Sequence, residues 1–374
     1  VVGDNPGRLE QALTESFARA DIVITTGGLG PTTDDLSKET AAHYFGRKLV
    51  RDEKALADMR QMMEHSGRTM TPNNLKQADL PEGAIPLYNQ NGTAPGFILE
   101  GNGRILIMLP GPPSEMKPMF EQQVKPYLLK DSDTRLVSHT MHFFGIGESM
   151  LEDRLRSLME KSLNPTVAPY AKTGEVQLRV TARVKNGEDP NALLEPVMEQ
   201  IRQTVGEFLY GVDVGDLQTA VVRLLTEKER KVAVAESCTG GYLAKRITDV
   251  SGSSKVFECG VCSYSNRIKH QLLGVSEQTL AEYGAISEQT AAQMASGVRN
   301  LSGADIGISV TGNAGPTADE GKEVGLVYIG VDSPKLTRVF TLNVNRRDQD
   351  ARETIRYLAS SHALSLILKA AERL

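Results

Sequence analysis

The sequence of 374 residues has no tryptophan and only three cysteines, and aromatic residues make up 5% of the chain. An odd number of cysteines in a long chain without a signal segment excludes a disulfide-stapled secreted protein and favours a reducing cytosol. Cys259 and Cys262 lie in an apolar strand pattern, where residues three apart point to opposite faces, so we expect buried thiols rather than metal ligands. No apolar run reaches the roughly 18 residues of a membrane helix. We therefore expect a cytoplasmic protein without a membrane partner.

A surplus of positive charge is also missing. Lys and Arg number 42 against 47 Asp and Glu, which gives a net charge of -5, and the pI is near 5.8. These values do not favour direct contact with nucleic acid. Hydrophobic residues at 40% and charged residues at 24% are typical of a globular protein with full apolar cores, and the length predicts two or three domains.

Strand and helix patterns alternate in residues 1–132 and again in residues 212–374. Such alternation predicts α/β domains with parallel strands that are covered by helices on both faces. Between them, residues 133–211 combine a strand of period two, 176–184, with two amphipathic helices, which predicts a small α+β module. The amphipathic helix that begins at Leu217 suits a homodimer.

Two loops of the first region offer polar groups after predicted strands. In the glycine-rich loop from Thr25 to Asp35, close backbone approach and a helix N-terminus suit an anion. Its adjacent carboxylates, Asp34 and Asp35, suit a divalent cation against a pyrophosphate, and a helix N-cap is the equal alternative. The loop from Leu109 to Met116 follows a fully apolar strand and adds Glu115, for which a place in the first helical turn is the simpler account.

Three loops of the last region also follow predicted strands. The loop from Ala235 to Gly241 offers potential nucleophiles or phosphate ligands. In the stretch from Ser251 to Lys269, Tyr264 ends a strand and Lys269 lies in the next helix, where a desolvated lysine acts as general base to a serine. An exposed helix lysine is the alternative. The loop from Thr311 to Pro316 joins the same crevice only if the strands are neighbours.

Together these motifs resemble the CinA family, competence- and damage-inducible protein A. The strings TTGGLGPTTDDLSKET, NGTAPGF, LPGPPSEM, AESCTGG, GSS, SYSN and TGNAGP occur in the family's order along the whole chain. The resemblance implies a MoaB/MogA-like first domain with metal-dependent ADP-ribose pyrophosphatase activity. It also implies a last domain similar to bacterial nicotinamide mononucleotide deamidase, which yields nicotinate mononucleotide and ammonia. The rival interpretation is a pterin- or nucleotide-binding partner protein in competence or DNA repair, without catalysis in the first domain.

The deamidase resemblance makes Ser254 the nucleophile, Lys269 its general base and Tyr264 the group that orients or relays the proton. The residues that it implies for binding phosphate, ribose and carboxamide are Ser237, Thr239, Gly240, Gly241, Asn266, Thr311, Gly312 and Arg352, the last preferred to Arg347. The first-domain nucleotide site comprises Gly27, Gly28, Gly30 and Thr33. The resemblance to MoaB-type loops implies Asp35 as the metal ligand, with Asp34 and Glu115 as weaker candidates. It implies a divalent metal, with K+ as a further candidate, and no cofactor is expected for the deamidase domain.

Against the family pattern, the residues Val2 to Asn5 fall well inside the first domain. A strand, a glycine-containing loop with an acidic residue and a helix precede them in the family. We therefore expect a first domain that is truncated at its start.

Overall fold

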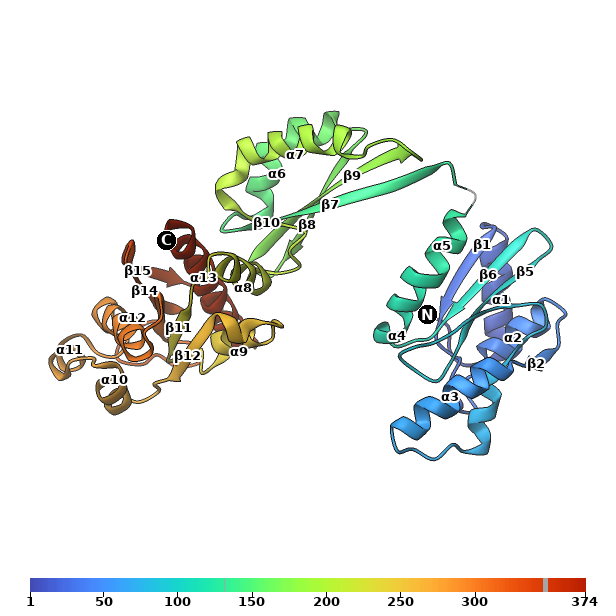
Figure 1. The fold of residues 1–374 in the computed structure, drawn as a ribbon, viewed down its shortest axis with the longest axis horizontal. Coiled ribbons are helices and arrows are strands. Elements are labelled where there is room, and N and C mark those ends of the chain that lie inside the picture. The colour runs from blue at the N-terminus through green and yellow to red at the C-terminus, as the bar shows by residue number, and fades with distance from the viewer. Residues whose placement is uncertain (131, 346–348) are drawn as a thin grey trace. The chain divides into compact units, whose positions relative to one another are not determined.

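The chain divides into two compact units, Val1–Asp133 and Thr134–Leu374. The computed structural model describes residues 1–130, 132–345 and 349–374 (Figure 1). Both units combine helices and strands, which confirms the α/β prediction. Among the described helices, none is long and apolar enough to span a membrane.

A four-stranded sheet of order β1-β6-β5-β4 organises the first unit. Its strands are β1 (Ile22–Thr26), β4 (Ile85–Leu87), β5 (Gly96–Gly101) and β6 (Arg104–Leu109). Only β1 and β6 are parallel, so the prediction of a parallel sheet is wrong for β5 and β4. Asn102 and Gly103 have φ values of 54° and 72°, as a two-residue hairpin turn requires, and this turn makes β5 and β6 antiparallel.

Helices and short segments complete the first unit. They are α1 (Pro6–Phe17), α2 (Ser37–Tyr44), β2 (Leu49–Arg51), α3 (Glu53–His65), the 3-10 turn η1 (Pro72–Ala78), β3 (Asp79–Pro81), α4 (Pro113–Met119), the π-helical turn η2 (Phe120–Val124) and α5 (Lys125–Leu129). The Asn5 side chain caps α1 by accepting a 3.1 Å hydrogen bond from the Arg8 N–H. Leu13 and Phe17, on the predicted apolar face of α1, are buried in a core with Leu106.

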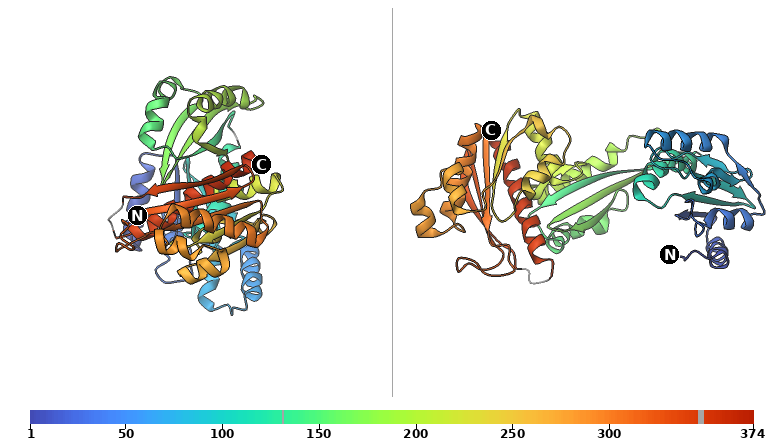
Figure 2. Two further views of the ribbon diagram at one scale, coloured as in Figure 1. Left: turned by 90° about the vertical axis from the view of Figure 1, so that its left-hand side faces the viewer. Right: turned by 90° about the horizontal axis from the view of Figure 1, so that it is seen from below.

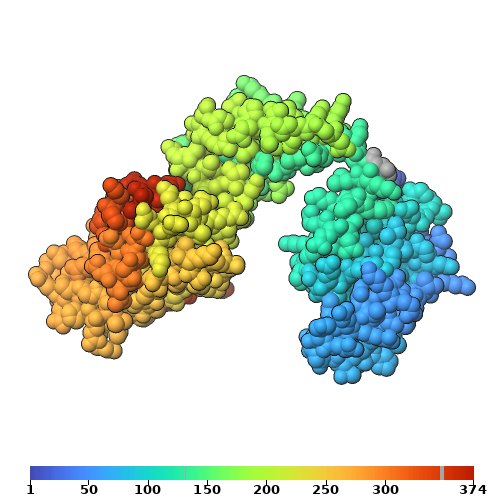
Figure 3. All heavy atoms as spheres, in the orientation of Figure 1, coloured from blue at the N-terminus to red at the C-terminus, as the bar shows by residue number. Residues whose placement is uncertain are grey.

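The middle module, at the start of the second unit, is a βαββαβ arrangement. Its elements are β7 (Thr134–Phe144), α6 (Glu148–Lys161), β8 (Thr166–Lys172), β9 (Glu175–Lys185), α7 (Asn191–Val205), the 3-10 turn η3 (Gly206–Phe208) and β10 (Leu209–Val212). The antiparallel strand order β10-β7-β9-β8 is that of a ferredoxin-like sheet. Both helices cover one face of this sheet. The module adjoins the last domain (Figure 3). The rings of Phe144 in the module and His362 in the last domain are 4.8 Å apart.

A five-stranded sheet of order β12-β11-β13-β14-β15 forms the last domain. Its strands are β11 (Val232–Glu236), β12 (Phe257–Cys262), β13 (Ile306–Gly312), β14 (Leu326–Ser333) and β15 (Leu336–Asn343). The first three strands in this order are parallel and the last two are antiparallel, which again corrects the prediction of a parallel sheet. The sheet therefore has one edge at which three parallel strands end together.

Helices cover both faces of this sheet (Figure 2). One face packs against α8 (Leu217–Glu227), α9 (Tyr242–Thr248) and α13 (Ala351–Arg373), and the other against α10 (Asn266–Leu273), α11 (Glu277–Tyr283) and α12 (Glu288–Ser302). The apolar side chains of α8, among them Leu217 and Val221, are buried in this core. Because the chain itself buries this helix face, α8 gives no support to the expected homodimer.

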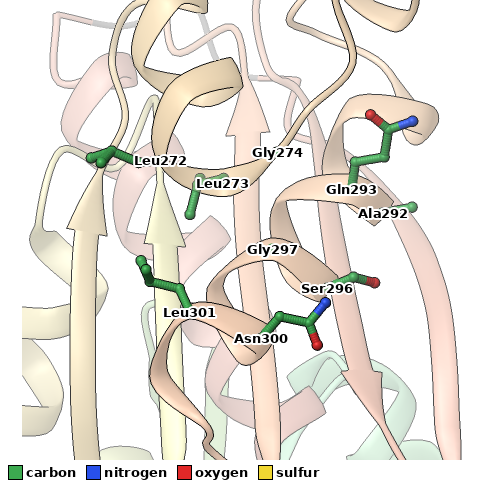
Figure 4. A pocket seen from close by; sticks show the side chains of 9 residues that line it. All are labelled: Leu272, Leu273, Gly274, Ala292, Gln293, Ser296, Gly297, Asn300 and Leu301. Carbon is green, nitrogen blue, oxygen red and sulfur yellow. The ribbon is translucent and has the colours of Figure 1, made fainter.

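Helices α10 and α12 approach each other closely at a glycine. A Cβ atom on Gly297 would lie 1.9 Å from the carbonyl oxygen of Leu273. Figure 4 shows Gly297 on α12 facing the end of α10, at Leu273 and Gly274, in a groove of about 600 Å³. No side chain larger than hydrogen fits between the two helices at this point.

We expect Gly297→Ala to lower the free energy of unfolding by about 1–3 kcal/mol, because the added methyl group forces α10 away from α12. At an unconstrained helical position the same substitution stabilises a protein by about 1 kcal/mol, so the sign of the change tests the contact. Urea unfolding followed by circular dichroism measures it. Asn300→Ala, at an exposed position of the same helix, is the control. A more stable Gly297→Ala protein would contradict the close approach.

Candidate functional sites

The carboxyl ends of β11, β12 and β13 bring the predicted deamidase loops to one edge of the last sheet. Ser237 follows β11, Tyr264 follows β12, and Thr311 and Gly312 end β13. The three strands are direct neighbours in the sheet. The loops after them therefore share one crevice, at the position where open α/β sheets bind ligands.

Lys269 is the buried centre of this crevice, with a side chain that is 1% exposed. Ser265 caps α10 by accepting a hydrogen bond from the Ile268 N–H, which fixes the helix turn that carries Lys269. The Lys269 Nζ atom lies 3.2 Å from Ser237 Oγ and donates a 2.8 Å hydrogen bond to the Ser263 carbonyl. Burial lowers the pKa of Lys269 below that of an exposed lysine.

Ser254, the nucleophile that the family resemblance implies, lies at the opposite end of the same strand. It belongs to the 3-10 turn Ser253–Lys255, which precedes β12. The strand β12 has six residues and spans about 20 Å at roughly 3.3 Å per residue. The pair of Ser254 and Lys269 is therefore not formed within one chain, and the serine hydroxyl beside Lys269 is that of Ser237.

The carboxylate of Glu236 closes the loop between β11 and α9. Glu236 is 1% exposed. It accepts hydrogen bonds of 2.8 to 3.1 Å from three backbone N–H groups, those of Gly241, Leu243 and Ala244. The Gly240 N–H binds the Ser237 carbonyl. The N–H groups of Gly240 and Gly241, two of the predicted binding residues, are thus both engaged by groups of the chain itself.

Two of the predicted binding residues serve the packing of β13. The hydroxyl of Thr311, which is fully buried, donates a 2.7 Å hydrogen bond to the Ala285 carbonyl. A Cβ on Gly312 would lie 2.6 Å from the Leu326 carbonyl oxygen, so glycine permits the pairing of β13 with β14. Asn266 is the exposed first residue of α10. These residues line or support the crevice, and no described contact gives them a ligand-binding role.

Arg352, at the start of α13, crosses the mouth of the crevice. Its guanidinium donates to the Gly315 carbonyl, and its Nη2 lies 3.4 Å from the hydroxyl oxygen of Tyr264. The structure thus brings the predicted Arg352 and Tyr264 together with the loop after β13. Arg347, the rival of Arg352, lies outside the described residues.

Arg356 reaches the same crevice and was not among the predicted residues. Its Nη2 donates a 2.7 Å hydrogen bond to the carbonyl of Thr239, whose own buried hydroxyl has no partner among the described residues. The sequence signal is the spacing of four from Arg352, which places both arginines on one face of a helix. Two guanidinium groups therefore lie at the carboxyl edge of the sheet.

The three cysteines differ in burial. Cys238 is buried, and burial raises its pKa to about 12, which keeps the thiol protonated at neutral pH. Cys259 is partly buried and Cys262 is exposed, so the expectation of a buried thiol is wrong at Cys262. Within the described residues, no group of three His, Cys, Asp or Glu side chains is placed to hold a metal ion.

In the first unit a cavity of about 310 Å³ lies where β1 and β6 end. It is lined by residues from both predicted loops and from two further segments: Gly27, Gly28, Leu29, Gly30, Asp35, Gln77, Thr93, Ala94, Pro110, Gly111, Pro112 and Glu115. Thr33 and Asp34 are exposed and are not part of its lining. The structure therefore brings together the predicted glycines, Asp35 and Glu115.

Each of the two cavity carboxylates is held by a neighbouring side chain. The Oδ2 of Asp35 accepts hydrogen bonds from the N–H and the hydroxyl of Thr32, at 3.0 and 2.6 Å. The Oε2 of Glu115 accepts a 2.7 Å hydrogen bond from the Asn89 amide. Magnesium uses one or two carboxylates together with substrate phosphates, so Asp35 and Glu115 fit a divalent ion that arrives with a phosphorylated ligand.

Two lysines support this cavity from behind. The Nζ of Lys76 donates to the carbonyls of Thr32 and Asp35, the second at 3.0 Å. Lys38, which is 3% exposed, donates to the carbonyl of Lys76. Burial lowers the pKa of Lys38 to about 8. The glycine loop is thereby tied to η1 through lysine-to-carbonyl hydrogen bonds.

Lys38 makes the stability of the first unit depend on pH. Its pKa is about 8 in the folded protein and 10.5 otherwise, so between these values the unfolded chain binds more protons and the free energy of unfolding rises with pH. The full rise amounts to roughly 3 kcal/mol. Urea unfolding at several pH values in this window should show a shallower rise for Lys38→Met, and an unaltered rise for the exposed control Lys48→Met. Equal slopes in the wild type and Lys38→Met would exclude a depressed pKa.

Comparison with known proteins covers all three parts of the chain. Family models match residues 1–130 ("Probable molybdopterin binding domain"), 138–211 ("Damage-inducible protein CinA KH domain") and 215–371 ("CinA C-terminal domain"). A CinA-like protein of Kosmotoga olearia is 47% identical over 371 residues, which are 99% of this chain and 89% of that protein. A CinA-like protein of Dictyoglomus turgidum is 47% identical over 332 residues, 88% of this chain and 81% of its own length.

Among solved structures, the competence/damage inducible protein CihA of Agrobacterium tumefaciens is 34% identical, with a TM-score of 0.39, over 42% of this chain and 95% of that one. The sequence motifs, the matched domains and the near-complete alignment with CinA-like relatives agree with one another. The chain belongs to the CinA family.

Proposed function

We propose that the chain deamidates nicotinamide mononucleotide to nicotinate mononucleotide and ammonia at the carboxyl edge of its last sheet. The observation that carries this proposal is the buried Lys269 amine, 3.2 Å from the hydroxyl of Ser237. A serine with an adjacent lysine of lowered pKa is a nucleophile and base pair for acyl transfer. The choice of substrate rests on the resemblance of this domain to bacterial nicotinamide mononucleotide deamidase.

The proposed reaction uses Lys269 twice. In the first half, Ser237 Oγ bonds to the carboxamide carbon while its proton passes to Lys269 Nζ. The carbon–nitrogen bond then breaks, and ammonia leaves with the proton from Lys269, which leaves an ester on Ser237. In the second half, Lys269 takes a proton from water, the resulting hydroxide attacks the ester, and Ser237 recovers its proton as the nicotinate product leaves.

Arg352 and Arg356 are the groups that we propose for the phosphate of the nucleotide. The Glu236 carboxylate occupies the N–H groups at the start of α9, so the backbone there does not bind an anion. Guanidinium groups bind phosphate through charged hydrogen bonds, and both arginines contact loops of the crevice. Tyr264, 64% exposed at the mouth, is placed to contact the ribose or the ring.

Substitution of each serine identifies the nucleophile. We expect Ser237→Ala and Lys269→Ala to lower the release of ammonia from nicotinamide mononucleotide at least about a hundredfold, with circular dichroism unchanged. Ser254→Ala should stay within twofold of the wild type, because Ser254 lies at the far end of β12. The wild-type rate should rise with pH and level off at a pKa below 10.5, as the lowered pKa of Lys269 requires.

An active Ser237→Ala protein together with an inactive Ser254→Ala protein would overturn the assignment of Ser237. A mixture of inactive Ser254→Ala and Lys269→Ala proteins would then test for a centre shared between two copies, which is the form in which Ser254 could meet a lysine. Regained activity in the mixture would also establish the homodimer expected from the sequence.

For the first unit we propose metal-dependent cleavage of ADP-ribose at the cavity of about 310 Å³. Asp35 and Glu115 would hold the divalent ion, which neutralises the charge of the pyrophosphate when it is bound. Gly27 leaves open space beside the backbone for a phosphate, whereas Ser37 and Asp35 fill the space beside Gly28 and Gly30. The alternative is a pocket that binds a pterin or a nucleotide without cleaving it.

The adjacent aspartates provide a matched pair for testing this site. We expect Asp35→Asn to lower the formation of AMP from ADP-ribose in the presence of Mg²⁺ or Mn²⁺ at least about tenfold, and to leave deamidation unchanged. Asp34→Asn carries the same change of charge one residue outside the cavity lining and should stay near the wild-type rate. Binding of ADP-ribose without formation of AMP in the wild type would favour the non-catalytic pocket.

A further inference from the structure

Three hydroxyl side chains form a row across the parallel strands at the carboxyl edge of the last sheet. Glu236 of β11 is in register with Cys262 of β12 and with Val310 of β13. One position further along, the three strands carry Ser237, Ser263 and Thr311. The ladder continues to this level, because the Ser263 N–H donates a 2.8 Å hydrogen bond to the Glu236 carbonyl. The Ser237 N–H donates one of 2.8 Å to the Val310 carbonyl, so Ser237 lies between the other two hydroxyl residues.

This row faces α10 and α12. Side chains alternate between the two faces of a sheet along each strand, and the residues two positions before the serines, Ala235 and Val261, pack in the core on the side of these helices. Lys269 reaches the row from α10: its Nζ lies 3.2 Å from Ser237 Oγ and donates a 2.8 Å hydrogen bond to the Ser263 carbonyl. Lys269 and the two serines therefore meet on one side of the sheet.

The three hydroxyls of the row differ in their partners. The fully buried hydroxyl of Thr311 donates to the Ala285 carbonyl at 2.7 Å, and that of Ser237 contacts Lys269. Ser263 is fully buried as well, but its Oγ has no hydrogen-bond partner among the described residues. Buried hydroxyls are nearly always hydrogen-bonded, to an ordered water where the chain offers no partner. A molecule from outside the chain is therefore expected at Ser263.

The surroundings of Ser263 suit a water molecule rather than a larger ligand. The side chain is closed off from the solvent, and a buried water needs two to four polar partners. Lys269 Nζ is one such partner, since it is held on the carbonyl of Ser263 itself. Ser237 is another, because neighbouring strands lie about 4.8 Å apart, close to the span of one water between two hydrogen-bonding oxygen atoms.

We propose that Ser263 is a positioning residue that holds the hydrolytic water against the ester on Ser237. This inference rests on the proposed function, in which Ser237 carries an acyl group once ammonia has left. The water, bound to Ser263 Oγ, passes one proton to Lys269 Nζ as its oxygen bonds to the ester carbon. The bond between this carbon and Ser237 Oγ then breaks, and Oγ takes the proton back from Lys269. The acid product loses its remaining proton to the solvent.

No water is consumed while the ester forms, so loss of the Ser263 hydroxyl should slow only the second half of the reaction. With p-nitrophenyl acetate and the full chain, release of nitrophenolate measures acylation, and mass spectrometry measures the loss of the acetyl group. In Ser263→Ala we expect acylation within about twofold of the wild type and loss of the acetyl group at least about tenfold slower. Ser263→Thr, which keeps a hydroxyl, should lose the acetyl group as the wild type does.

Hydroxylamine provides an independent readout of the same step. It attacks an ester as a nucleophile in its own right, so it does not need a water that Ser263 holds. We expect it to speed the loss of the acetyl group much more in Ser263→Ala than in the wild type. A site that is merely distorted by the substitution would respond to hydroxylamine no more than the wild type, and this result would overturn the proposed role.

Ser309→Ala is the matched control. Ser309 is also fully buried, two positions before Thr311 on the same face of β13, and its hydroxyl donates a 2.6 Å hydrogen bond to the Ala291 carbonyl. Its substitution should leave the ratio of the two rates unchanged, although it removes a structural hydrogen bond. Thermal melting by circular dichroism verifies that each variant is folded.

The acetyl ester tests Ser263 whatever the natural substrate is. With nicotinamide mononucleotide, Ser263→Ala should rapidly release about one equivalent of ammonia per chain and then turn over slowly. A wild type that forms and hydrolyses the acetyl ester but releases no ammonia would overturn the choice of substrate alone. Unchanged loss of the acetyl group in Ser263→Ala, or equal slowing of both steps, would overturn the role of Ser263. An acetyl group on a serine other than Ser237 would overturn both proposals.

Discussion

The buried carboxylate of Glu236 is the constraint on which the crevice at the carboxyl edge of the last sheet depends. It ends β11 and binds three N–H groups of the following loop and helix, so it fixes the start of α9 and with it the position of Ser237. The same carboxylate also offsets the positive end of the α9 helix dipole. In the proposed reaction the phosphate of the nucleotide is therefore bound by side chains, and helix α13 places two arginines at this edge.

Local patterns in the sequence predicted much of this fold and some of the residues that meet in each site. The apolar run of β6 and the glycine loops after β1 and β11 are local features, and they appear where expected. The parallel sheets were only partly correct, because the Asn102-Gly103 turn reverses the chain between β5 and β6. Periodicity reports which residues share a face, but not which strands pair.

The position of Ser254 shows that the sequence also does not reveal which residues meet in the site. It is close to Lys269 in the chain, but β12 lies between them and carries the two residues to opposite ends of the sheet. Ser237 is much further from Lys269 along the chain and lies 3.2 Å from it in space. Arg356 escaped prediction for a related reason, since its partner is a backbone carbonyl that has no signature in the sequence.

Glycines in the first unit make room for carboxylates as well as for a ligand. A Cβ on Gly30 would lie 2.3 Å from the Asp35 Oδ2, and a Cβ on Gly92 would lie 2.1 Å from the Glu115 Oε2. Each acidic side chain thus lies over a glycine backbone. The absence of a side chain at Gly30 and at Gly92 therefore leaves the space that the carboxylates of Asp35 and Glu115 occupy.

The middle module differs in charge balance between its two sides. Three arginines on its helix side form ion pairs with carboxylates. Among the described residues, the basic side chains at positions 179, 183 and 185 of β9 form no ion pair. The net charge of -5 therefore conceals a local surplus of positive charge on one side of a small sheet.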